Sequence, residues 1–151
     1  MTSSSSEHNS PPPQWQESLS TALDCSGKAA ELVQQSQRLV TVAPGTDIFV
    51  QASAPTAIYL LLTGTAHMIG RLGQREAQMG TIVPGMLCDP AACILNAPHN
   101  YTARSVTSCD LATLPIAIWQ KLIEEFPSVS MKAAAQISSD LRGVVKQIAS
   151  R

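Results

Sequence analysis

The 151-residue sequence lacks several features that would point directly to a class of protein. No apolar run is long enough to span a membrane, and the N-terminus has no basic segment followed by an apolar one. A net charge of −1 argues against a general nucleic-acid-binding surface. The four cysteines, Cys25, Cys88, Cys93 and Cys109, form no Cys-x-x-Cys pair. Together these absences predict a soluble, cytoplasmic protein that binds neither membrane nor nucleic acid directly.

The sequence is equally poor in catalytic and metal-binding patterns. Its three histidines, His8, His67 and His99, include no His-x-His pair, so a mononuclear metal site is not expected. No serine or cysteine lies in a recognisable nucleophile motif, and no paired-carboxylate motif stands out. We therefore predict that the protein is not an enzyme. Cys88 and Cys93 lie five positions apart and leave a thiol- or metal-based redox sensor open as an alternative.

The pattern of apolar residues divides the chain into a tail and one domain. Residues 1–13 contain a run of serines and a run of prolines with almost nothing apolar to bury, which predicts a disordered tail. Apolar residues at helical spacing predict two short helices within 14–36. The remainder completes a single domain over 14–151, with a β-rich part at 38–115 and C-terminal helices at 116–150.

The β-rich part consists of short runs rich in Val, Ile, Leu and Thr, separated by turn residues. This pattern is typical of a sandwich or barrel. The predicted strands are Arg38–Val42, Ile48–Val50, Ala57–Thr63, Ala66–Arg71, Glu76–Met79, Thr81–Val83, Tyr101–Val106 and Asp110–Leu114.

The end of the chain carries a narrow apolar stripe. Ile137, Leu141, Val144 and Ile148 continue a heptad spacing, and polar residues between them leave only a thin apolar line. A stripe of this width usually packs against a partner helix, so we predict a homodimer. The alternative is that the stripe packs on its own domain.

The stretch from Pro84 to Arg104 lies between two strand-like runs and combines turn and helix signals. It opens on Pro84-Gly85, continues with Asp89-Pro90 and a short apolar segment, and ends near Pro98. A short helix in this place exposes backbone N–H groups at its N-terminus, and those groups favour an anion. The pattern therefore predicts a ligand site in this stretch.

This spacing resembles the phosphate-binding cassette of cyclic-nucleotide-binding domains, as found in the catabolite activator protein (Crp/Fnr) family. Pro84-Gly85, Pro98 and Thr102 match that cassette, and Asp89 stands where the family has glutamate. The turn at Pro44-Gly45 and the run from Tyr59 to Gly64 match further landmarks of the family in the same order. The resemblance implies a mainly β jelly roll (double-stranded β-helix) with flanking helices and a C-terminal dimerisation helix.

In the resembled cassette the glutamate holds a ribose hydroxyl, and an arginine and the helix N-terminus hold the cyclic phosphate. The resemblance therefore implies a ligand site for cAMP or cGMP and no other cofactor. Its residues would be Asp89, the N–H groups near Pro90, Ala91 and Ala92, and the side chains of His99 and Thr102.

Two positions depart from the family pattern, since Cys88 replaces a glycine and His99 replaces the arginine. Histidine offers fewer donors than arginine and is mostly neutral near pH 7, and a lost charge-assisted contact costs about 1.5–3 kcal/mol. Arg104 is close in the sequence, but an odd separation from residue 99 places it on the opposite side of a strand. We therefore expect a degenerate cassette.

The sequence contains no helix-turn-helix pattern after the C-terminal stripe. We predict a non-enzymatic regulatory or sensor module whose output passes through a protein partner. Two alternatives stay open at this point. One is a ligand-free protein-interaction or dimerisation module, and the other is the redox sensor based on Cys88 and Cys93.

Overall fold

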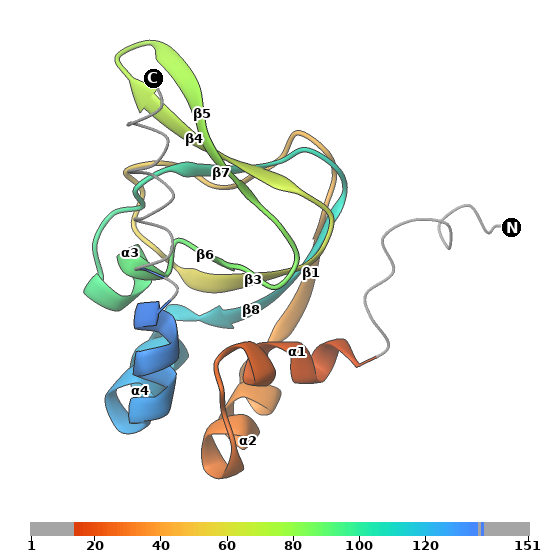
Figure 1. Ribbon diagram of the computed structural model, residues 1–151, viewed down its shortest axis with the longest axis vertical. Helices are drawn as coiled ribbons and strands as arrows, with labels where there is room; N and C mark the ends of the chain where they lie inside the picture. The colour runs from red at the N-terminus through yellow and green to blue at the C-terminus, as the bar shows by residue number, and fades with distance from the viewer. Residues whose placement is uncertain (1–13, 136, 138–151) are drawn as a thin grey trace, which may run out of the picture.

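The computed structural model describes residues 14–135 and 137, which form two facing antiparallel β-sheets with helices gathered at one end (Figure 1). The first sheet has the strand order β1-β8-β3-β6 and the second has the order β2-β7-β4-β5. The strands are β1 (Arg38–Val42), β2 (Asp47–Phe49), β3 (Ala57–Thr63), β4 (Ala66–Leu72), β5 (Arg75–Ile82), β6 (Leu87–Cys88), β7 (Thr102–Ser105) and β8 (Cys109–Pro115).

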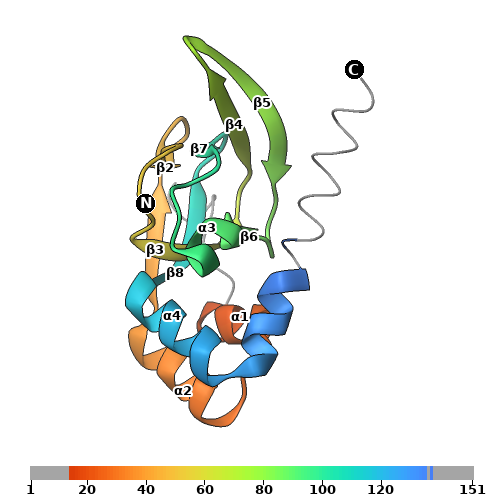
Figure 2. The ribbon, with the colours of Figure 1, turned by 90° about the vertical axis from the view of Figure 1, so that its left-hand side faces the viewer.

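Three helices, α1 (Trp15–Ala22), α2 (Gly27–Ser36) and α4 (Ile116–Glu125), pack below the first sheet (Figure 2). The short helix α3 (Pro90–Leu95) follows β6, and residues 127–135 are also helical. This architecture confirms the predicted mainly β roll with flanking helices.

Two apolar cores lie on opposite faces of the first sheet. One fills the space between that sheet and the helices, around Leu60, Leu114 and Trp119. The other fills the space between the two sheets and includes Leu61 and Leu111. Because both faces are covered, β8 is buried along nearly its whole length, including the polar residues Asp110 and Thr113.

The predicted glycine corners have the backbone that only glycine adopts freely. Gly45, Gly64 and Gly85 have φ angles of +79°, +96° and +96°. At Gly64 an added Cβ would also collide with the carbonyl oxygen of Ser108. The turn interpretation of these positions is therefore confirmed.

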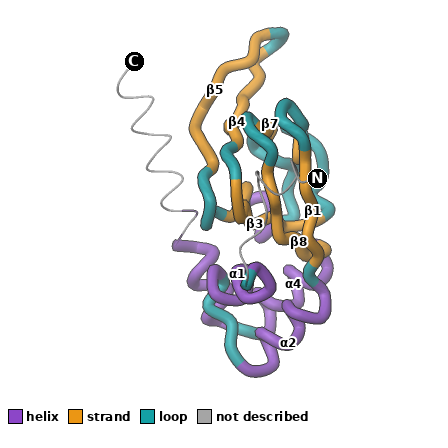
Figure 3. Tube along the Cα trace, turned by 90° about the vertical axis from the view of Figure 1, so that its right-hand side faces the viewer, coloured by secondary structure: helices purple, strands orange, loops and turns teal. Residues whose placement is uncertain are grey.

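The hairpin of β4 and β5 extends away from the helical end of the domain (Figure 3). The prediction of two strands here, Glu76–Met79 and Thr81–Val83, is wrong, because Gly80 does not end the pairing. Gly80 lies opposite Met68 and Gln78 lies opposite Ile69, so Met79 is an extra residue in a bulge. The bulge keeps β5 continuous at a glycine that the sequence pattern marks as a break between strands.

Strand β6 was not expected from the sequence, because only two residues pair with β3. The predicted tail at 1–13 lies outside the described residues. So do three members of the C-terminal stripe, Leu141, Val144 and Ile148. Ile137 is described, and it is half-buried.

Candidate ligand-binding cassette

Two left-handed residues define the limits of helix α3. Asp89 precedes the helix with φ 48° and ψ 56°, and Asn96 follows it with φ 51° and ψ 45°. Asp and Asn adopt this conformation more readily than other non-glycine residues, because their short side chains bond locally. Pro90 then occupies the first turn, where a missing N–H is tolerated. The sequence Asp-Pro…Asn thus produces a helix of six residues.

The side chain of Asp89 is only 3% exposed and accepts hydrogen bonds from His99 and Asn100. His99 Nδ1 lies 3.0 Å from Oδ2, and the backbone N–H of Asn100 donates to the same oxygen at 2.8 Å. The Asn100 side-chain amide donates to Oδ1 at 3.0 Å. The backbone N–H of Asp89 donates to the Tyr101 hydroxyl at 2.7 Å. Both oxygens of the carboxylate are thus committed to the protein itself.

His99 is held by its ring and by its backbone. The residue as a whole is 4% exposed. Its ring stacks on the ring of Phe49, with ring centroids 3.8 Å apart and planes 12° apart. Its N–H donates to the Ser53 carbonyl at 2.9 Å, and its carbonyl accepts from the Ala52 N–H at 2.9 Å. The loop before β3 therefore fixes the position of the histidine.

Burial alone would raise the pKa of the Asp89 carboxyl. The hydrogen bonds from His99 and from the backbone and side chain of Asn100 outweigh burial, and the pKa of Asp89 is lowered. Asp89 is therefore ionised at neutral pH and acts only as an acceptor, so Nδ1 of His99 carries the hydrogen that it donates.

The structure brings Asp89 and His99 together, but it directs Thr102 elsewhere. The Thr102 hydroxyl oxygen accepts from the Gln51 N–H at 2.9 Å, and Thr102 lines a depression that Arg104 also lines. Pro90 and Ala92 are buried, and Ala91 is half-buried. Whether any of these residues binds a ligand stays a prediction.

Arg104 faces away from the cassette, as the odd separation from residue 99 predicted. Its Nε donates to Asp47 Oδ1 at 2.7 Å, and its Nη1 donates to Glu76 Oε1 at 2.9 Å. These partners lie on the outer side of the second sheet, whereas Tyr101 and Ala103 of the same region face the core between the sheets. Arg104 therefore does not take the place of the missing arginine.

Sequence reasoning missed three residues of this site, Asn100, Phe49 and Tyr101. Asn100 follows His99 directly, and a carboxylate with a nearby amide is a signal that could have suggested pairing. Phe49 is fifty positions from His99 in the sequence, so only the fold places the two rings together.

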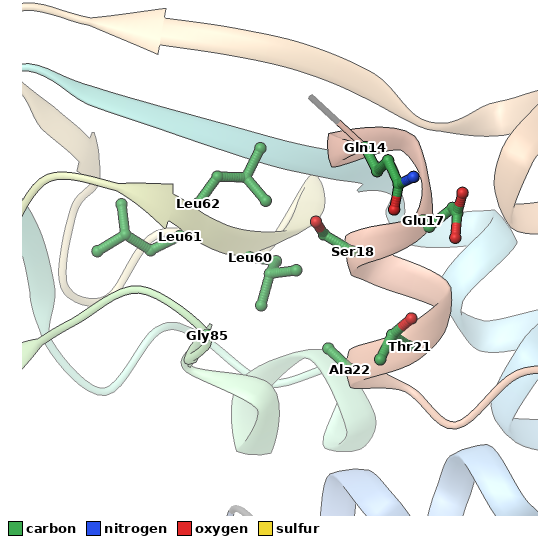
Figure 4. A pocket seen from close by; sticks show the side chains of 9 residues that line it. All are labelled: Gln14, Glu17, Ser18, Thr21, Ala22, Leu60, Leu61, Leu62 and Gly85. Atoms are coloured by element: carbon green, nitrogen blue, oxygen red, sulfur yellow. The ribbon is translucent and has the colours of Figure 1, made fainter. Parts of the chain in front are cut away.

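A separate cavity of about 780 Å³ lies between helix α1 and strand β3 (Figure 4). Polar residues of α1, among them Glu17 and Ser18, form one wall, and Leu60, Leu62 and Gly85 form the other. None of the predicted site residues lines this cavity, so we do not connect it with the cassette.

Three of the four cysteines in the described part of the chain are buried, namely Cys88, Cys93 and Cys109. Burial raises the pKa of Cys93 to about 12. Burial also raises the pKa of Cys25 to about 11. Within residues 14–135 and 137, no three His, Cys, Asp or Glu side chains gather in a way that could hold a metal ion.

The described fold is thus a roll of two four-stranded sheets with a short helix between β6 and β7. Residues 39–126 match the family model described as "Cyclic nucleotide-binding domain", and the chain belongs to this family. This match confirms the resemblance found from the cassette and the glycine corners. No curated protein sequence matches the chain.

Several solved structures share the fold. The catabolite activator protein of Thermus thermophilus is 22% identical with a TM-score of 0.67, and the match covers 87% of this chain and 57% of that one. The c-di-GMP-responsive regulator CLP of Xanthomonas campestris is 18% identical with a TM-score of 0.69, covering 80% and 62%. The sensor domain of the transcriptional regulator DNR of Pseudomonas aeruginosa is 18% identical with a TM-score of 0.68, covering 87% and 91%.

The chain thus spans roughly three fifths of the first two of these relatives and most of the isolated DNR sensor domain. In the described part of the chain, no helix combines the length and apolar character needed to cross a bilayer.

Proposed function

We propose that this domain is a non-enzymatic regulatory module whose cassette is held closed by its own side chains. In this account cAMP and cGMP are not tight ligands, and the output passes through contacts with protein. The domain would keep the roll of its family and lack the family's nucleotide recognition.

The three hydrogen bonds that the Asp89 carboxylate accepts are the observation that carries this proposal. Because Asp89 is only 3% exposed, a ribose hydroxyl could reach this carboxylate only if His99 or Asn100 moved, and each charge-assisted hydrogen bond contributes about 1.5–3 kcal/mol. His99 would also have to leave its stack on Phe49 before it could turn toward a phosphate. Ligand binding therefore has to work against an arrangement that is already satisfied.

The first test is calorimetric titration of the full chain with cAMP and cGMP at about pH 6 and about pH 8, on either side of the ordinary histidine pKa. We expect no binding heat and no thermal stabilisation at about 1 mM nucleotide. Micromolar binding at either pH would overturn the closed cassette. Binding that strengthens only at the lower pH would indicate that a protonated group supplies the phosphate contact.

We propose that the chain forms a homodimer through the apolar stripe Ile137, Leu141, Val144 and Ile148. Of these residues only Ile137 is described. The support is the heptad spacing of the sequence. We expect Leu141→Asp to yield a monomer in light scattering, because a charge in the seam would be desolvated. Ser139→Asp is the matched control at a polar position of the heptad pattern, and it should remain a dimer. A monomeric wild type would refute the seam.

The redox alternative is not favoured by the thiols that the structure describes. The reactive form of cysteine is the thiolate, and a pKa of about 12 leaves almost none of it for Cys93 at neutral pH. Replacing Cys88 and Cys93 with serine should leave any response to oxidant unchanged, and a loss of response would revive this function.

A further inference from the structure

We propose that the outer face of the second sheet carries a binding site for a small zwitterion, a molecule with an ammonium group and a carboxylate, and that this site is coupled to the cassette. The site is a depression of about 500 Å³. Its floor is formed by β2, β4, β5 and β7, and its walls are the loop at residues 50–52 and the hairpin near Gly73. The existence of this site does not depend on the function proposed above.

The charged groups of this depression balance one another. Arg71 and Arg104 contribute two positive charges, and Asp47 and Glu76 contribute two negative charges. A ligand with a net charge of either sign therefore gains little from the summed field. A ligand that carries both charges matches a site whose own charges are separated in space.

The negative end has room for an ammonium. Asp47 and Glu76 share the single guanidinium of Arg104, so this group of three side chains has one negative charge in excess. The two carboxylates remain 36% and 41% exposed, and a carboxylate accepts more hydrogen bonds than Arg104 supplies to each. An ammonium placed between them would be paired with the excess charge.

The positive end has donors to spare. Neither the Arg71 guanidinium nor the Gln51 side-chain NH2 donates a hydrogen bond among the described residues, although Arg71 interacts electrostatically with Glu76. The Thr102 hydroxyl accepts from the Gln51 N–H and keeps its own hydrogen to donate. These donors suit a carboxylate, which a guanidinium binds with a matching planar fork.

The wall of the depression is also the support of the cassette, and this link carries the coupling. Gln51 Oε1 accepts from the Arg71 N–H at 2.7 Å, so the loop is tied to the floor of the depression. The next residue, Ala52, donates to the His99 carbonyl, and Ser53 accepts from the His99 N–H. A ligand that orders this loop would therefore stabilise the position of His99, an effect that rests on the closed cassette proposed above.

The test is a titration of the ¹⁵N-labelled full chain with glycylglycine, followed by amide chemical shifts. We expect saturable shifts at Gln51, Arg71 and Thr102, with weaker shifts from acetate or from methylammonium alone at equal ionic strength. Arg71→Gln should weaken glycylglycine binding about tenfold or more, because a charge-assisted contact is lost. Arg75→Gln is the matched control, since Arg75 does not line the depression and should bind as wild type does.

Three outcomes would overturn the site: no saturable shift with glycylglycine, acetate binding as strong as that of glycylglycine, or equal binding by wild type and Arg71→Gln. Coupling is read separately, as slower hydrogen exchange at the His99 amide when the site is saturated. An unchanged exchange rate would contradict the coupling but not the existence of the site. Neither result depends on cyclic nucleotide, so failure here and failure of the closed cassette are distinguishable.

Discussion

Carboxylates meet nitrogen donors in two regions of this domain, at similar distances but in opposite surroundings. In the cassette, Asp89 is 3% exposed and lies 3.0 Å from His99. On the outer face of the second sheet, the Asp47 side chain is 36% exposed and lies 2.7 Å from Arg104. The shorter contact, between Asp47 and Arg104, contributes less to stability, because water competes for exposed charges. The buried carboxylate of Asp89 has no other donors available.

Burial therefore assigns different roles to the two regions. The cassette is a closed network in which removing one partner leaves others unsatisfied, whereas the outer face can exchange partners at little cost. In our proposals the buried network resists a ligand, and the exposed face accepts one. The closed cassette and the outer binding site are both argued from this difference in burial.

The largest expected effect comes from removing the buried charge. Asp89→Asn should lower the free energy of unfolding by roughly 2–3 kcal/mol in urea denaturation at neutral pH, because His99 and Asn100 lose a charged acceptor. Asparagine tolerates the left-handed backbone at this position, so the substitution tests the charge. Asp47→Asn, the matched change at the exposed pair, should cost under about 1 kcal/mol. Equal losses at the two positions would contradict the comparison.

The stability difference between wild type and Asp89→Asn should also depend on pH. The pKa of Asp89 is lowered from its ordinary value of 3.8, so its contribution is complete above that value and is lost as pH falls toward the lowered pKa. We expect the two unfolding curves to converge in acid, as measured by urea denaturation from neutral pH downward. A difference that grows as the pH falls would show the opposite sign of the pKa change.

Restoring the arginine of the family tests whether the cassette is closed by more than one residue. We expect His99→Arg to show no cAMP binding at about 1 mM, because an arginine beside the buried Asp89 would pair with that carboxylate. Titration calorimetry measures this directly, with His67→Arg on strand β4 as the control for added charge. The appearance of micromolar affinity in His99→Arg would mean that the cassette is intact apart from one side chain.

A smaller effect is expected in the loop that joins the two regions. Ala52 has a φ of +73°, which strains a non-glycine residue by about 1–2 kcal/mol. Glycine relieves this strain and costs about 0.5–1 kcal/mol of chain entropy, so Ala52→Gly should stabilise by about 0.5–1 kcal/mol in thermal unfolding. Ala54→Gly, a neighbour without a positive φ, should destabilise. Destabilisation by both changes would show that the strain is absent.

The smallest effect is expected on the outer face. Arg104→Gln should change stability by less than about 1 kcal/mol, and the change should disappear at about 1 M salt, where exposed charges are screened. Urea denaturation at low and high salt measures it. A large loss that persists in salt would show that Arg104 supports the sheet in another way.

The roll could be predicted from the sequence because its signals are local. Runs of β-branched residues alternate with turns, and Gly45, Gly64 and Gly85 each need a positive φ that their immediate neighbours already suggest. Position 80 shows the limit of such reasoning, since a glycine that looks like a break is paired across a bulge.

The closure of the cassette could not be predicted, because it depends on contacts between distant residues. The spacing identified Asp89 and His99 but not the stack of His99 on Phe49, which the fold alone creates. Thr102, like Arg104, is an odd number of positions from His99, so strand alternation places both on the side opposite to His99. The same rule therefore excludes Thr102 from the expected anion site.

A double-mutant cycle between Asp89 and His99 tests the closed cassette most directly. The free energy of unfolding is measured for wild type, Asp89→Asn, His99→Gln and the double variant, with the Asp47 and Arg104 pair as the exposed reference. We predict a coupling of about 1.5–3 kcal/mol in the cassette and less than about 1 kcal/mol on the outer face. Additive effects of Asp89→Asn and His99→Gln would contradict the account, because the two side chains would then not hold the cassette together.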